Sequence, residues 1–176
     1  MSEWLINGAC FLGALVGMEW VAWATHRYVM HGPLWVLHRS HHEPRHGAFE
    51  LNDLFAVIFA GMAIGLFALG SALDQSWMFW TAAGITAYGA LYALVHDGLV
   101  HQRWPFRYVP RRGYFRRLYQ AHRLHHAVEG RDDCVSFGFV YAPPVDDLKA
   151  RLKASGVLAQ RQSRHQDAWR PDRGED

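Results

Sequence analysis

The chain has 176 residues, which suits a single domain with a sizeable core. Its formal net charge is only +2, so a nucleic-acid-binding role is not expected. Charged residues make up 19% of the chain and apolar residues 51%, and nearly all the charge falls in residues 26–50 and 96–176. This segregation indicates an integral membrane protein.

Three apolar stretches predict membrane-spanning helices. Residues 54–73 and 77–95 carry no charge, and residues 4–25 carry one within the apolar run, Glu19. A helix needs about 20 apolar residues to cross a bilayer, so all three qualify. Only Asp74-Gln75-Ser76 separates the second and third stretches, which predicts a hairpin. The expected fold is therefore all-α, a bundle of about three to four membrane helices.

Pairs of glycines at four-residue spacing occur in two of these stretches. They are Gly13 with Gly17 and Gly61 with Gly65. Small residues at this spacing allow helices to approach closely in a membrane. We expect them to pack against other helices of the same chain rather than to form a dimer.

The connections predict on which side of the membrane the polar segments lie. The first helix ends near residue 26, and the hairpin leaves that side near residue 53 and returns near residue 96. Residues 26–50 and everything from 96 onward therefore share one side. That side holds Arg27, Arg39, Arg45, Arg103, Arg107, Arg111, Arg112, Arg116 and Arg117. The excess of arginine predicts that it is the cytoplasmic side.

The remainder of the chain is more polar. Residues 114–129 predict a helix that stops at Gly130, and residues 145–155 predict a short amphipathic helix. The segment DCVSFGFVYAPP, residues 133–144, is too short to span a membrane and has strand-like or surface-hugging character. Residues 161–176 have the composition of a disordered tail, so the domain is expected to cover residues 1–160.

Neither a targeting signal nor a cysteine site is expected. The N-terminus, MSEW, has an acidic residue where a cleavable signal peptide has basic ones. The two cysteines, Cys10 and Cys134, are far apart in the sequence, and two thiols are too few to indicate a cysteine-based metal site.

Histidines follow a pattern that occurs twice. A pair spaced HxxxxH is followed by a triplet spaced HxxHH, once before the hairpin and once after it. The first set is His26, His31, His38, His41 and His42, and the second is His96, His101, His122, His125 and His126. In a helix the three members of HxxHH share one face. The members of HxxxxH diverge by about 140° in a straight α-helix, so a bulge or an irregular helix end is expected at each pair.

Neutral imidazole is a good ligand for iron, zinc, copper and nickel. Ten imidazoles are too many for one ion, so the pattern predicts two ions with four or five histidines each. His46 and His165 lie outside the pattern and are not predicted to be ligands. The segment HEPRH, residues 42–46, matches the HExxH motif of zinc proteases. Pro44 disfavours the continuous helix that this motif requires, so a protease is not expected.

Other polar residues are candidates for supporting roles. Glu19 lies inside a membrane helix, on nearly the same face as His26, and could accept an imidazole N–H. Asn52, Asp53 and Asp97 could do the same. Four arginines precede the second HxxHH triplet and could dock an acidic electron donor or hold lipid headgroups: Arg111, Arg112, Arg116 and Arg117.

The histidine pattern resembles that of the membrane fatty acid hydroxylase superfamily. Within it, HRYVMHGPLWVLHRSHHEPRHGAFELNDLFAVIFA and GYFRRLYQAHRLHHAVEGRDDCVSFGFVYAPP are similar to the bacterial beta-carotene 3-hydroxylases, over roughly residues 15–155. The resemblance implies two non-haem iron ions that use O2 and two electrons, usually from ferredoxin and its reductase, to hydroxylate C3 of a beta-ionone ring. Beta-carotene would become beta-cryptoxanthin and then zeaxanthin, and canthaxanthin would give astaxanthin. It also implies that the substrate enters from the lipid, and zinc is expected to replace iron in purified protein.

Three alternatives remain at this stage. A fatty acid or sterol hydroxylase or desaturase of the same superfamily would share the histidine pattern. A haem-binding electron carrier would also use histidines of membrane helices, although as paired single residues. A metal transporter would place its ligands near the middle of the bilayer rather than at helix ends.

Overall fold

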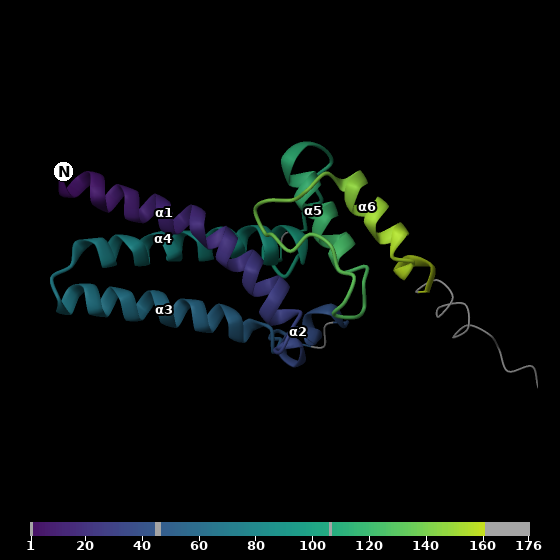
Figure 1. Ribbon diagram of the computed structural model, residues 1–176, viewed down its shortest axis with the longest axis horizontal. Coiled ribbons are helices and arrows are strands. Elements are labelled where there is room, and N and C mark those ends of the chain that lie inside the picture. Colours follow the sequence, from purple (N-terminus) through teal and green to yellow (C-terminus); the bar gives the residue numbers. More distant parts are fainter. Residues whose placement is uncertain (1, 45–46, 106, 161–176) are drawn as a thin grey trace, which may run out of the picture.

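The structure is a computed structural model that describes residues 2–44, 47–105 and 107–160. The predicted tail, His46 and His165 lie outside the described residues. Within the described part of the chain, every regular element is helical, in agreement with the predicted fold class. Three long helices run side by side, and the shorter helices gather at the end of this bundle that lies away from the N-terminus (Figure 1).

The three long helices correspond to the predicted membrane spans. Helix α1 (Glu3–Ala24) continues into η1 (Thr25–Met30), α3 covers Asp53–Ala72, and α4 (Ser76–Tyr92) continues into η2 (Ala93–Val100). All three are long and apolar enough to cross a bilayer. Their outer surfaces carry many exposed apolar side chains, such as Val16 and Val57. Such a surface suits contact with lipid and not with water.

Helix α4 packs against both α1 and α3. A Cβ atom added at Gly84 of α4 would lie 2.4 Å from the carbonyl oxygen of Phe11 and 2.8 Å from Cβ of Ala14, so only glycine permits this approach to α1. The predicted packing role of the glycine pairs is wrong. At Gly13, Gly17, Gly61 and Gly65 an added Cβ would meet nothing within 4 Å.

The two HxxxxH pairs lie on π-helices, η1 and η2. The backbone N–H of His31 donates to the carbonyl oxygen of His26 at 3.0 Å, and the N–H of His101 donates to that of His96 at 2.9 Å. A π-helix has i to i+5 hydrogen bonds, so residues five apart share a face there. The predicted irregularity at each pair is confirmed, and it turns both histidines of each pair toward the same site.

The shorter helices form a cap at one end of the bundle. They are α2 (Trp35–His42), α5 (Gly113–His125) and α6 (Val145–Ala154). Leu118 of α5 and Leu148 and Leu152 of α6 belong to one buried apolar cluster, which also includes Val95 of η2. This shared core fixes α5 against the membrane helix η2.

The structure differs from the sequence prediction in the last part of the cap. Helix α5 ends at His125 and not at residue 129. The chain leaves the helix because Val128 is buried in the cap core and its carbonyl oxygen accepts a hydrogen bond from His42 Nδ1 at 3.1 Å. Residues 133–144 form no strand; they are an irregular segment whose backbone binds side chains of other elements.

Candidate metal centre

All ten patterned histidines converge between the cap and the ends of η1 and η2. Eight of them form two neighbouring groups, each with four potential metal-ligating nitrogens within 4.8 Å of one another: His26, His31, His38 and His125, and His41, His96, His101 and His122. The ring centroid of His42 lies 5.0 Å from that of His125, and the ring centroid of His126 lies 4.8 Å from that of His101. We call His26, His31, His38, His42 and His125 the first cluster, and His41, His96, His101, His122 and His126 the second cluster.

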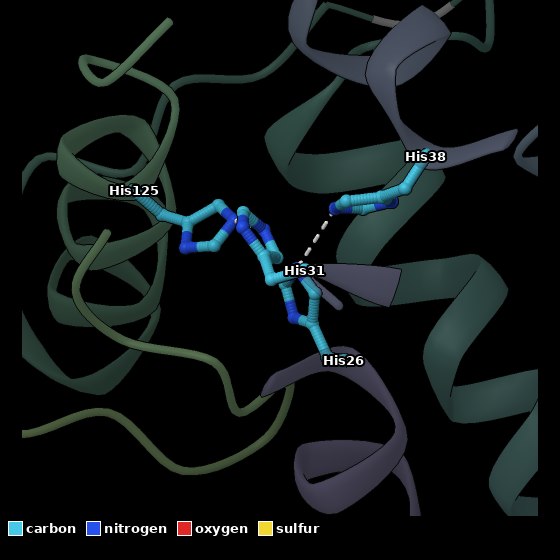
Figure 2. Close-up of side chains that lie close together, drawn as sticks. All are labelled: His26, His31, His38 and His125. Carbon is cyan, nitrogen blue, oxygen red and sulfur yellow. Dashed lines mark hydrogen bonds between the residues drawn. The ribbon is translucent and has the colours of Figure 1, made fainter. Parts of the chain in front are cut away.

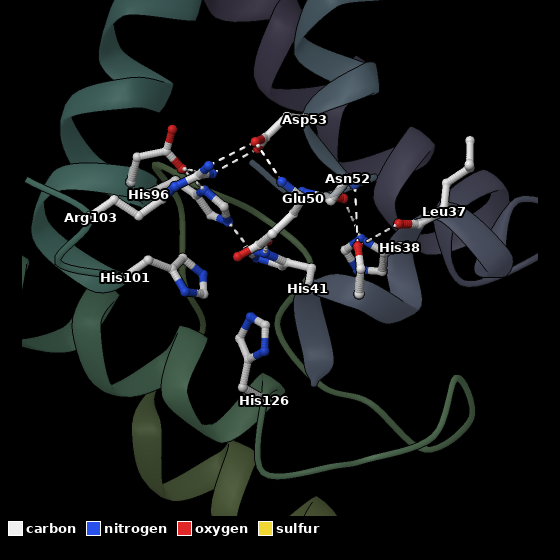
Figure 3. Close-up of polar contacts among 12 residues, drawn as sticks. Leu37, His38, His41, Glu50, Asn52, Asp53, His96, His101, Arg103 and His126 are labelled. Atoms are coloured by element: carbon white, nitrogen blue, oxygen red, sulfur yellow. Dashed lines mark hydrogen bonds and ion pairs between the residues drawn. The ribbon is translucent and has the colours of Figure 1, made fainter. Parts of the chain in front are cut away.

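The two clusters do not follow the order of the sequence. Each contains one HxxxxH pair and the outer two histidines of the HxxHH triplet that follows it. The middle histidines are exchanged, since His41 of α2 lies with the second cluster and His125 of α5 lies with the first (Figures 2 and 3). Helices α2 and α5 therefore each contribute to both clusters.

The ring nitrogens within a cluster face one another. The Nε2 atoms of His26 and His38 are 3.1 Å apart, those of His31 and His125 are 3.2 Å apart, and those of His41 and His96 are 3.0 Å apart. In each of these pairs both Nδ1 atoms point at an oxygen acceptor, so Nδ1 carries the proton. In neutral imidazoles the facing Nε2 atoms then present two lone pairs to each other. A cation between them removes this repulsion, and ligand nitrogens about 2.0–2.1 Å from one ion lie roughly 3 Å from each other.

The histidines of the cap are held in the neutral form that metal ligation requires. Burial lowers the pKa of His38 to about 3 and the pKa of His42 to about 4. Burial, together with the neighbouring imidazoles, lowers the pKa of His41, His122 and His125 well below its usual value. At neutral pH these side chains offer lone pairs and no charge.

Every histidine of the first cluster donates its Nδ1–H to an uncharged acceptor. His38 donates to Asn52 Oδ1 at 2.7 Å, which is the supporting role predicted for Asn52. The other four donate to backbone carbonyl oxygens at 2.8 to 3.1 Å. These acceptors belong to Val128, Arg131, Val135 and Phe137. The sequence contains no pattern that identifies backbone acceptors, so they were not predicted.

The second cluster uses carboxylates. His96 donates to Asp97 Oδ1 at 2.8 Å, as predicted for Asp97, and His41 donates to Glu50 Oε2 at 2.8 Å. Glu50 was not predicted, although its position near the membrane helix and close after the first HxxHH could have suggested it. Behind these groups, Arg103 donates to both carboxylate oxygens of Asp53 at 2.7 Å and lies 3.6 Å from Asp97 (Figure 3). Asp53 thus holds the arginine that neighbours Asp97.

Glu19 does not have the predicted imidazole partner. Its carboxyl group accepts hydrogen bonds from the Tyr88 hydroxyl and from the backbone N–H groups of Phe139, Val140 and Tyr141. The prediction is wrong because the irregular segment 137–141 folds over the end of α1 and occupies the space beside Glu19.

Cys134 lies closer to the histidines than the sequence suggested. Its Sγ atom and potential ligand nitrogens of His42 and His125 are all within 4.8 Å of one another. Cys134 and Cys10 are both free thiols. Burial raises the pKa of the Cys134 thiol to about 12, and Sγ lies 3.4 Å from the carbonyl oxygen of Gly130. Each cluster already has five imidazoles and Sγ donates to Gly130, so we do not assign Cys134 to a cluster.

The arginines before the second triplet do not surround the histidines. Arg111 and Arg112 precede the first residue of α5, whereas its histidines lie in its last turn. Arg112 and His122 are ten residues apart, which corresponds to about 15 Å along a helix. Arg116 donates to the carbonyl oxygen of Pro110, and Arg117 lies over the ring of Tyr114.

An apolar cavity of about 560 Å³ lies between α1, α3 and α4, within the membrane-spanning part. Its end nearest the clusters is formed by Tyr92, Asp97 and Phe139. The ring of Tyr92 stacks on His96 at 4.5 Å between centroids. Ala56, Ala60 and Ile64 of α3 line the cavity and are exposed. A hydrocarbon in this cavity would therefore be separated from the imidazoles only by the rings of Tyr92 and Phe139 and the side chain of Asp97.

The HExxH motif does not form a helix. Helix α2 ends at His42, and Glu43 has extended backbone angles, φ −94° and ψ 161°. Its carboxylate pairs with Arg39 at 3.0 Å on an exposed surface. The described part of the motif thus lacks the geometry of a zinc protease.

Comparison with known proteins agrees with this site. A sequence model of the fatty acid hydroxylase family matches residues 11–148, which include all ten histidines. The chain belongs to the fatty acid hydroxylase family. It is 60% identical over 159 residues to a protein of Paracoccus sp. (strain PC1) named beta-carotene hydroxylase, covering 90% of this chain and 95% of that protein.

Further relatives of the family carry similar names. The beta-carotene hydroxylase of Pantoea ananas is 58% identical over 85% of each chain. The chloroplastic beta-carotene 3-hydroxylase 1 of Arabidopsis thaliana is 48% identical over 72% of this chain and 42% of that protein. No solved structure matches the chain.

Proposed function

We propose that this protein hydroxylates C3 of the beta-ionone rings of carotenoids, with two non-haem iron ions, O2 and two electrons per turnover. The observation that carries the proposal is the position of the apolar cavity, which ends at Tyr92 and Phe139, and the rings of these residues stack on His96 of the second cluster and His26 of the first. The similarity to beta-carotene hydroxylases over most of both chains supports the same substrate class.

The residues fit two metal ions. The first cluster would hold one ion and the second cluster the other, through the Nε2 atoms that face each other at 3.0 to 3.2 Å. Iron bound there would activate O2, which is needed because no side chain of the protein can attack an unactivated C–H bond. The protein orients the ligands, because each hydrogen bond donated by an Nδ1–H group fixes the tautomer and the plane of its imidazole ring.

The cavity supports a substrate that dissolves in the bilayer. It is lined almost entirely by apolar side chains, and its volume lies in the range of small-molecule binding sites. The exposed lining residues of α3 lie along a membrane span, so the ring of a carotenoid could enter from lipid without crossing water. The rest of the polyene would remain among the acyl chains.

We further propose that the histidine end of the bundle faces the cytoplasm of a bacterial inner membrane. The excess of arginine in the polar segments on that side supports this orientation. Electrons would then come from a cytoplasmic donor, for which an acidic ferredoxin with its reductase is the candidate. Arg111, Arg112, Arg116 and Arg117 lie at the start of α5 and remain candidates for docking it or for holding lipid headgroups.

Product analysis tests the proposed function. The chain is expressed in bacteria that accumulate beta-carotene, with iron supplied, and the pigments are separated by chromatography. We expect beta-cryptoxanthin and zeaxanthin, and astaxanthin when canthaxanthin is the starting pigment. His101→Ala serves as the inactive control and Glu3→Gln as the active one. Correctly inserted protein that makes no hydroxylated carotenoid, or that oxidises only fatty acids or sterols, would refute the proposal.

A further inference from the structure

Glu19 is a carboxylic acid inside the first membrane helix, and both of its oxygens are occupied. Oε2 accepts the Tyr88 hydroxyl at 2.7 Å, while Oε1 accepts the backbone N–H groups of Phe139, Val140 and Tyr141 at 3.0, 3.1 and 2.9 Å. Hydrogen bonds to a carboxylate are stronger than those between neutral groups. One side chain of α1 thus holds three consecutive amides of a segment about 120 residues later in the sequence.

The backbone around this carboxyl group is shaped to enclose it. A Cβ atom added at Gly138 would lie 2.7 Å from Glu19 Oε1 and 2.5 Å from the carbonyl oxygen of Tyr141. No other residue fits there without moving the segment. The interaction is therefore a specific joint between α1 and residues 137–141.

This joint places the ring of Phe139, which is buried and lines the end of the apolar cavity. The ring stacks on His26 of the first cluster, with centroids 5.2 Å apart and planes at 13°. It also meets His96 of the second cluster edge-on at 5.2 Å, and Tyr92 at 4.8 Å. Phe139 thus stands between the cavity and imidazoles of both clusters.

We propose that Glu19 is a positioning residue that fixes Phe139 as the inner wall of the substrate cavity, and that this wall determines which ring carbon reaches the metals. The inference rests on the proposed function and adds the residues that set its regiochemistry. Without the three hydrogen bonds from backbone N–H groups to Glu19, the 137–141 segment would move and Phe139 would withdraw from the end of the cavity. Carbons next to C3 would then come within reach of oxidation.

The test compares Glu19→Ala with Phe139→Ala, and with Glu3→Gln as the control at the exposed start of the same helix. Hydrogen exchange of peptides covering residues 137–142 reports whether the segment is held. In Glu19→Ala we expect exchange at least about tenfold faster, because three backbone N–H groups lose their hydrogen-bond acceptor. Tyr88→Phe leaves the three hydrogen bonds from the backbone N–H groups in place and should leave this exchange unchanged.

The products and the metals provide the second readout. We expect Glu19→Ala and Phe139→Ala each to form a several-fold larger share of products hydroxylated at C2 or C4, with the metal content per chain unchanged. Glu19→Gln keeps an oxygen acceptor and should fall between Glu19→Ala and the unmodified protein.

Three outcomes would overturn the inference. Exchange that does not rise in Glu19→Ala would show that the joint does not hold the segment. Faster exchange with unchanged product positions would show that the wall does not select the carbon. Loss of metal from Glu19→Ala would show that the joint serves the first cluster through the Phe137 carbonyl and not the substrate. If the unmodified protein makes no hydroxylated carotenoid, the proposed function fails. The hydrogen-exchange experiment still tests whether Glu19 holds residues 137–141, because it needs no substrate.

Discussion

The two histidine clusters have the same kind of side chain but different surroundings. In the first cluster all five Nδ1–H groups donate to backbone carbonyls or to the amide of Asn52. In the second cluster His41 and His96 donate to the carboxylates of Glu50 and Asp97. A carboxylate behind an imidazole makes it more basic and adds negative charge to the site. The comparison indicates that two ions bound here would not be equivalent.

A positive charge, that of Arg103, lies beside the carboxylates that neighbour the second cluster. Arg103 binds Asp53 through two hydrogen bonds and lies near Asp97. The hydrogen bonds with Asp53 raise the pKa of Arg103, so its positive charge is secure at any working pH. Because Arg103 is paired mainly with Asp53, the carboxylates of Glu50 and Asp97 still act on His41 and His96. We expect the second cluster to retain metal more firmly than the first, and the following changes test that difference.

The largest effect is expected from loss of a ligand. His31→Ala in the first cluster and His101→Ala in the second should each lower the metal content from two ions to one per chain. Hydroxylation should fall by more than the roughly 100-fold that loss of a supporting partner can cause. Metal analysis of purified protein and pigment chromatography measure both quantities. Two ions per chain in either variant would contradict the assignment of that histidine.

Changing the charge behind the imidazoles should have the next largest effect. Glu50→Gln and Asp97→Asn keep a hydrogen-bond acceptor but remove the negative charge, so metal affinity of the second cluster should fall about tenfold. Asn52→Asp adds a carboxylate behind His38 and should strengthen retention in the first cluster. Titration with a chelator, followed by metal analysis, separates the release of the first metal ion from the release of the second. If the two steps of metal release in these variants are the same as in the unmodified protein, the clusters do not differ in the way inferred.

Arg103→Gln should have a smaller effect, mainly on stability. It leaves the carboxylates of Asp53 and Asp97 without their cation, which should cost about 1–3 kcal/mol. The exposed Arg39→Gln, which breaks only the surface pair with Glu43, should cost less than about 1 kcal/mol. Thermal unfolding in detergent compares the variants. Equal losses would show that the Arg103 network is no more than a surface ion pair.

The smallest effect is expected from the arginines at the start of α5. If they dock an acidic donor, neutralising Arg111, Arg112, Arg116 and Arg117 should lower turnover at limiting ferredoxin roughly two- to tenfold and weaken its dependence on salt. Replacing Arg151 and Lys153 of α6 by glutamine is the control for loss of positive charge. Reduced membrane insertion with normal turnover would instead assign the four arginines to lipid headgroups.

Local patterns predicted much of this molecule. Runs of apolar residues identified the three long helices, and the HxxxxH spacing required the irregular backbone that η1 and η2 provide. Asn52 and Asp97 were found because they lie near the ends of membrane helices, on the side of the bundle that carries the histidines. Glu50 lies in the same stretch of sequence but was missed, because no spacing rule connects it with His41.

Long-range contacts could not be predicted in the same way. The sequence placed Glu19 beside His26, because residues seven apart share a helix face, but it contained no indication that residues 137–141 would fold between them. The glycine pairs show the same limit: Gly13, Gly17, Gly61 and Gly65 have the spacing of a packing motif, yet the close contact is made by Gly84. Which face of an apolar helix meets another depends on how the helices cross.

The sequence by itself determined the membrane helices, the ten histidines and the chemistry they suit, because these depend on composition and on spacing within single helices. Only the tertiary structure decided how the histidines divide into two clusters, with His41 and His125 exchanged between them. It also decided which acceptors orient the rings and where the apolar cavity meets the imidazoles. The physical reason is that a helix face fixes the direction of a side chain, whereas its partners are set by the packing of α2, α5 and the 137–141 segment onto the ends of the membrane helices.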